Sequence, residues 1–107
     1  MFKVTAQPEF VRTVTVPLPE GDAQEEHTFR ARFRLTNDYD PDAIVTRDGM
    51  KAFLRRAVVG LDDVVDDAGT PLPFSPELLE QVLAFDAARL ALMRTYSRET
   101  TALKTGN

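Results

Sequence analysis

The stretch that decides the fold is HTFRARFRLT, residues 27–36. Apolar and polar residues alternate along it, which is the period of a β-strand with one buried and one exposed face. The apolar set is Phe29, Ala31, Phe33 and Leu35, and the polar set is Thr28, Arg30, Arg32, Arg34 and Thr36. Such alternation is typical of an antiparallel sheet and not of a parallel sheet buried on both faces. The sequence therefore predicts an antiparallel strand whose phenylalanines are covered by another apolar element.

A partner strand is predicted immediately upstream. Residues 9–18, EFVRTVTVPL, are rich in β-branched residues and place Phe10, Val14 and Val16 on one face. We expect Pro17 and Pro19 to end this strand, because proline cannot donate a backbone hydrogen bond. The acidic stretch PEGDAQEE, residues 19–26, has the composition of a hairpin loop. Residues 1–36 are thus predicted to form a β-hairpin region.

The middle of the chain, residues 37–74, is predicted to contain a loop, a short helix and turns. Asp48 is the expected N-cap of a helix whose apolar side carries Met50, Phe53, Leu54 and Ala57. The following stretch VVGLDDVVDDAGTPLPF, residues 58–74, indicates a short strand or bend and then turns, because β-branched pairs give way to glycine and proline.

The C-terminal region, residues 75–100, is predicted to be helical. Ser75 can cap the helix, Pro76 suits its first position and Glu77 complements its dipole. The apolar residues that follow are too widely spread for one stripe, so either the helix bends near Phe85–Asp86 or part of it contacts a partner. We expect the polar tail, residues 97–107, to fray. The prediction is one α+β domain over residues 1–107, with an N-terminal antiparallel hairpin or sheet packed against C-terminal helices.

Composition excludes several classes of function. The net charge of −4 opposes binding to phosphate backbones, and the absence of cysteine excludes disulfides, thiolate metal ligands and a cysteine nucleophile. The chain contains no apolar run of the ~20 residues that a membrane span needs. We therefore expect neither a nucleic-acid nor a membrane partner.

No motif in the chain predicts catalysis. His27 is the only histidine, and we interpret it as a strand residue beside the hairpin. Asp38, Asp40 and Asp42 have the spacing that opens a calcium loop, but Ala43 and Gly49 stand where that loop needs glycine and glutamate. The carboxylates of residues 62–67 lie in a turn and are expected to be hydrated. We predict no catalytic residue, no cofactor and no metal, and hence no enzyme.

Two surfaces are candidates for binding another protein. Leu90, Met93 and Tyr96 form either a docking stripe for a partner helix or ordinary core against Phe29 and Phe33. A second candidate is a basic ridge made by Arg30, Arg32 and Arg34 on one sheet face. This ridge could receive an acidic partner or the protein's own acidic hairpin, or it could be a solvated face that discourages aggregation.

The order of these features resembles the short tail assembly chaperones of long-tailed bacteriophages and prophages. The resemblance runs from the second strand to Lys104-Thr105-Gly106-Asn107. It rests on Phe29-x-Ala31-x-Phe33, Phe53-Leu54, Gly60-Leu61-Asp62-Asp63-Val64 and Asp67-x-Gly69-x-Pro71-x-Pro73-Phe74-Ser75-x-Glu77-Leu78. Leu61 stands where many relatives carry tryptophan.

The resemblance implies a non-enzymatic viral chaperone that acts in the cytoplasm of the bacterial host and is not retained in the mature virion. Its implied partners are the tape measure protein, which it coats, and the tail tube protein, whose polymerisation it promotes; weak homo-oligomers are also expected. Two alternatives stay open: a structural connector or terminator subunit of the tail, and a small regulatory module that binds a host protein.

Overall fold

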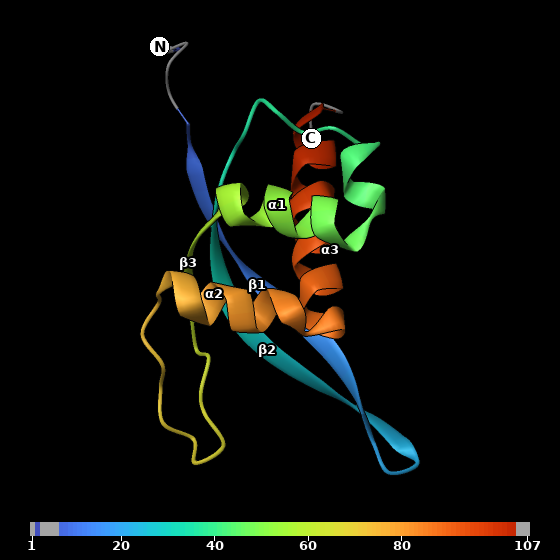
Figure 1. Ribbon diagram of the computed structural model, residues 1–107, viewed down its shortest axis with the longest axis vertical. Coiled ribbons are helices and arrows are strands. Elements are labelled where there is room, and N and C mark those ends of the chain that lie inside the picture. Colours follow the sequence, from blue (N-terminus) through green and yellow to red (C-terminus); the bar gives the residue numbers. More distant parts are fainter. Residues whose placement is uncertain (1, 3–6, 105–107) are drawn as a thin grey trace.

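The protein is an α+β fold, as predicted, in which a three-stranded antiparallel sheet precedes most of the helical residues (Figure 1). A computed structural model describes residue 2 and residues 7–104, with side chains as far as Thr101. The elements are β1 (Glu9–Glu20), β2 (Ala23–Arg34), the short 3-10 helix η1 (Ala43–Val45), α1 (Arg47–Ala57), β3 (Val58–Asp62), α2 (Pro76–Ala84) and α3 (Asp86–Lys104). The strand order is β1-β2-β3, so the predicted strand of residues 27–36 lies in the centre of the sheet.

The hairpin is longer than the sequence indicated. β1 continues through Pro17 and Pro19 to Glu20, and β2 begins at Ala23, so the predicted loop of residues 19–26 shrinks to two residues. The prolines are tolerated because β1 is an edge strand, where every second N–H faces away from the sheet and needs no partner. Gly21 has a φ of +59° at the first turn position, which is the glycine preference of a type II′ hairpin.

The central strand is joined to β3 through α1. Thr46, and not the predicted Asp48, caps α1: its hydroxyl oxygen accepts a hydrogen bond of 3.0 Å from the N–H of Gly49. Asp48 lies in the first turn, where its charge still complements the helix dipole. α1 passes directly into β3 at Val58, and the β2–β3 register shifts between Arg32 and Phe33.

The predicted break in the C-terminal helix is present. Ser75 caps α2 by accepting a 3.0 Å hydrogen bond from the N–H of Leu78, and α2 ends at Ala84. Phe85 is extended, with φ −88° and ψ 111°, and α3 starts at the next residue, so the two helices meet at an elbow (Figure 1). The expectation of a frayed tail is wrong for residues 97–104, which are helical, whereas residues 105–107 lie outside the described part.

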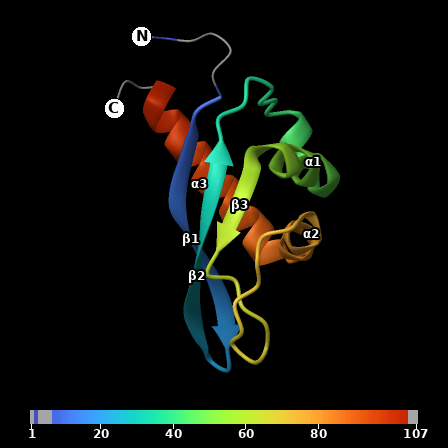
Figure 2. The same ribbon diagram turned by 90° about the vertical axis from the view of Figure 1, so that its left-hand side faces the viewer.

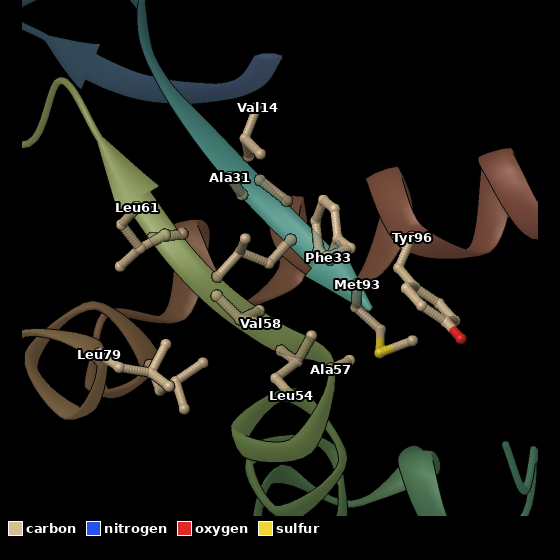
Figure 3. Packing of buried hydrophobic residues seen from close by; sticks show 14 of the residues in the cluster. Val14, Ala31, Phe33, Leu54, Ala57, Val58, Leu61, Leu79, Met93 and Tyr96 are labelled. Carbon is tan, nitrogen blue, oxygen red and sulfur yellow. The ribbon is translucent and has the colours of Figure 1, made fainter. Parts of the chain in front are cut away.

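All helices lie on one face of the sheet (Figure 2). The strand residues that point toward them are those that the alternation predicted, including Val14, Phe29 and Phe33. Figure 3 shows how Leu54, Leu79 and Met93 from the helices converge on this face. The opposite sheet face is covered by none of the described helices.

An aromatic cluster forms the centre of the core. The ring of Tyr96 lies 5.0 Å from Phe53, 5.8 Å from Phe33 and 6.1 Å from Phe10, measured between centroids. These contacts join α3 to α1, β2 and β1. The Tyr96 hydroxyl also accepts a 3.2 Å hydrogen bond from the N–H of Thr36. One side chain from the last helix therefore fastens the two strands and the first helix together.

Candidate protein-binding groove

The predicted docking stripe on the last helix is not a continuous surface. Met93 and Tyr96 are buried, with only 5% and 1% of their surface exposed, whereas Leu90 is 44% exposed. Met93 and Tyr96 therefore belong to the core, which is the second of the two interpretations that the sequence allowed. A stripe that needs all three residues at the surface is excluded in this fold.

The basic ridge lies on the sheet face that carries no helix, away from Leu90. Arg32 Nη1 lies 3.7 Å from Glu9 Oε1, and Arg34 donates a 2.9 Å hydrogen bond to the backbone oxygen of Arg56. Arg30 is paired in register with Asp62 of β3. The ridge is therefore not occupied by the acidic end of its own hairpin, because its neighbours come from the start of β1, from the end of α1 and from β3.

The structure brings together a different set of residues, which the sequence did not single out as a site. They form a groove of about 390 Å³ between the far half of the hairpin, the loop of residues 63–74 and the elbow of α2 and α3. We refer to it as the elbow groove. Its lining consists of Val16, Leu18, His27, Thr28, Phe29, Asp63, Val64, Val65, Leu72, Leu78, Gln81, Val82, Phe85 and Ala88.

One wall of the elbow groove is a helical stripe. Leu78, Gln81, Val82 and Phe85 recur at spacings of three and four residues, so they share one side of α2 and its C-cap. Phe85 is 53% exposed because the chain leaves the helix at this residue and turns into α3. A large aromatic residue is thus held at the rim, where a partner can cover it.

The elbow is fixed by a buried arginine. Arg89 is 6% exposed; its Nη1 donates a 3.0 Å hydrogen bond to the backbone oxygen of Leu83, and its Nη2 lies 2.9 Å from Asp86 Oδ1. The guanidinium therefore satisfies a carbonyl left free at the end of α2 and joins it to the start of α3. This contact sets the angle at which Phe85 is presented.

The opposite wall is an ordered loop. The N–H of Leu72 donates to the backbone oxygen of Val64 at 2.8 Å, and Val65 forms a β-bridge with Pro71. At the loop tip, Asp66 Oδ1 accepts hydrogen bonds of 2.9 Å from the N–H groups of Ala68 and Thr70. The loop therefore behaves as a small hairpin that holds Val65, which is 52% exposed, beside the groove.

The chain enters this loop through an unusual backbone conformation. Asp63 has a φ of +66°, the positive value that aspartate and asparagine tolerate better than most residues. It directs the chain away from β3 immediately after the strand ends at Asp62. Because Asp63 also lines the groove, the residue that bends the chain places a carboxylate at the rim.

The other acidic residues singled out in the sequence have local roles. Asp38 Oδ2 lies 2.6 Å from Arg56 Nε, and hydrogen bonding from Thr36, with help from Arg56, lowers the pKa of Asp38. Asp40 Oδ1 accepts a 3.0 Å hydrogen bond from the N–H of Asp42. This loop is therefore held by a hydrogen bond of its own and by an ion pair to α1.

One group near the groove has side chains of the types that bind metal ions. Glu20, Glu25 and His27 place their ligand atoms within 4.8 Å of one another on the hairpin. All three are exposed, and exposed clusters of this kind are common without an ion. We therefore assign them no metal, and His27 contributes to the site as a groove-lining residue.

No family model, curated protein or solved structure matches the chain. Among the residues that the structure describes, no helix combines the length and the apolar character needed to cross a membrane.

Proposed function

We propose that this protein is a non-enzymatic tail assembly chaperone of a long-tailed bacteriophage or prophage, which binds the tape measure protein in the host cytoplasm and promotes assembly of the tail tube around it. The observation that supports this proposal is the elbow groove, an apolar surface built from three separate parts of the fold. The order of sequence features that resembles this family supports the same assignment.

The groove has the properties expected of a site for a long helical client. Its floor is buried apolar side chains of the sheet such as Val16 and Phe29, while Phe85 and Val65 at its rim remain more than half exposed. An apolar stripe on a client helix, with contacts recurring every three to four residues, can cover these rim residues and remove their surface from water. Such binding needs neither a cofactor nor a reacting group.

The test is capture of the tape measure protein encoded beside this chain, using the full-length protein as bait. In the groove variant, Phe85→Ser and Val65→Ser remove the two exposed rim residues. The matched control carries Leu90→Ser and Val45→Ser, since these residues are 44% and 79% exposed and do not line the groove. Both double variants remove two exposed apolar side chains and should stay folded, which far-UV circular dichroism checks.

Capture by the parent and by the control, but not by the groove variant, is the expected result. Equal capture by all three would remove the groove from the binding site. If the parent does not capture the tape measure protein and is itself recovered in finished particles, the protein is instead a structural connector or terminator subunit. A discrete complex with a host protein instead would identify a regulatory module.

A further inference from the structure

Charge is sharply divided along this chain. Residues 13–29 and 57–88, which supply every lining residue of the elbow groove, contain eleven Asp and Glu residues and no Lys or Arg. The remaining residues hold all thirteen Lys and Arg and only six Asp and Glu. A net charge of −4 therefore conceals a strongly acidic set of segments around the groove and a basic remainder. Fields of this kind favour partners of the opposite charge.

Three of these carboxylates can be placed at the rim. Asp63 lines the groove itself. Glu25 is paired in register with Leu18, a lining residue, and is two residues from His27, so it shares their face of the hairpin. Glu77 precedes Gln81 by one helical turn on the groove side of α2. All three are exposed and come from the three different walls.

Three of the other acidic residues in these segments have cationic neighbours away from the groove. Glu80 accepts two hydrogen bonds from Arg55, at 2.7 and 2.8 Å, and Asp86 contacts Arg89. Asp62 faces Arg30 across the β2–β3 pair. Glu25, Asp63 and Glu77 are therefore exposed carboxylates at the groove rim that an incoming cation can reach, and Glu25 Oε1 also lies 3.8 Å from His27 Nε2.

From this arrangement we infer that the elbow groove binds an amphipathic helical segment of another protein whose apolar stripe is flanked by lysine or arginine. The apolar stripe covers Phe85 and Val65, while its flanking cations reach Glu25, Asp63 and Glu77. This inference rests on the proposed function for the identity of the site, but the charge requirement can be tested without the tape measure protein.

The probes are two synthetic helical peptides of about 18 residues, which share one leucine stripe at spacings of three and four. One carries lysine at the flanking positions and the other carries glutamate. Binding to the protein is measured by fluorescence anisotropy at about 50 mM and about 500 mM salt. The higher salt concentration screens exposed charges strongly. We expect the lysine peptide to bind about tenfold more tightly at low salt, and this preference to shrink at high salt.

Two charge-neutralised variants locate the effect. The first carries Glu25→Gln, Asp63→Asn and Glu77→Gln; asparagine is chosen because it tolerates the positive φ at residue 63. The second carries Glu9→Gln, Asp42→Asn and Asp48→Asn, which change the net charge equally but lie outside the acidic segments. The first should weaken lysine-peptide binding about 3- to 10-fold, and the second less than twofold.

Several outcomes would overturn the inference. One is equal binding of the two peptides; another is an equal effect of the two neutralised variants, which would point to net charge alone. Binding of neither peptide would also reject it, even if the tape measure protein is captured through Phe85 and Val65, since the client would then use other chemistry. Self-association of the parent at assay concentrations, lost in the first variant, would identify a second copy of this chain as the occupant.

Discussion

Replacing Tyr96 by alanine should remove a large share of the stability of this protein. The side chain is 1% exposed and contacts Phe10, Phe33 and Phe53, so its loss leaves a cavity between α3, α1 and the sheet. Large aromatic residues cut to alanine in a core cost about 3–5 kcal/mol. Since domains of this size are stable by about 5–15 kcal/mol, Tyr96→Ala should lower the unfolding free energy by about a fifth or more.

Tyr96→Phe measures the contribution of the hydroxyl separately from that of the ring. It keeps the aromatic contacts but removes the acceptor of the 3.2 Å hydrogen bond from the N–H of Thr36. A single hydrogen bond of this kind contributes about 1 kcal/mol, and Thr36 is only partly buried, so water can replace the lost partner. Leu90→Ala, on the exposed side of the same helix, should cost below about 0.5 kcal/mol.

The assay is urea unfolding followed by far-UV circular dichroism, because the chain has no tryptophan and Tyr96 is one of its two tyrosines. The expected order of destabilisation is Tyr96→Ala, then Tyr96→Phe, then Leu90→Ala. A loss below about 1 kcal/mol for Tyr96→Ala would refute the reasoning, because removing a tyrosine ring from a packed core has to cost more. That result would indicate that Tyr96 lies at the surface, as part of the docking stripe that the sequence also allowed.

Three further perturbations test other parts of the fold. Ser75→Ala should cost about 1 kcal/mol in urea unfolding by removing the cap on Leu78, whereas Ser75→Thr keeps a hydroxyl and should cost less. Gly49→Ala should cost about 3 kcal/mol, because an added Cβ would lie 1.7 Å from the backbone oxygen of Ala43; destabilisation below about 1 kcal/mol would contradict this close approach. Folding lowers the pKa of Glu80, chiefly through hydrogen bonds from Arg55, and the pKa of Asp38, chiefly through a hydrogen bond from Thr36. Both carboxylates therefore stabilise the fold at a pH above their pKa values in the unfolded chain. This stabilisation is lost as the pH falls through their lower pKa values in the folded protein. The melting temperature should consequently fall more steeply below about pH 5 in the parent than in Arg55→Ala, and parallel profiles would argue against the Glu80 contact.

The sequence predicted those elements whose signals are local. The alternation around Phe29 and Phe33 fixed the central strand, and Ser75-Pro76-Glu77 fixed the start of α2, because a pleat and a cap depend on a few neighbouring residues. Pro17 was misleading, since whether a proline ends a strand depends on whether that strand lies at the sheet edge. Thr46 was missed as a cap because Asp48 has the same preference two residues later.

The candidate site was harder to predict because its residues are distant in sequence. Val16, Val65 and Phe85 come together only when the hairpin, the loop and the elbow are placed around β2. Two signals were available: the break expected near Phe85, and the long stretch of residues 57–88 without Lys or Arg. The break indicated an exposed aromatic at a helix junction, and the charge pattern indicated an acidic surface, but neither shows which walls face each other.

The position of Tyr96 roughly 60 residues after Phe33 has a consequence for synthesis on the ribosome. The hairpin that carries Phe29 and Phe33 is made first, but α3, which helps to cover these rings, follows roughly 60 residues after Phe33. At about 5–20 residues per second, the nascent hairpin waits for about 3–12 s before this cover exists. Arg30, Arg32 and Arg34 alternate with the phenylalanines through that interval, and charges next to apolar strand residues oppose aggregation. We therefore expect the basic ridge to protect the unfinished chain at the stage when its central strand is most exposed.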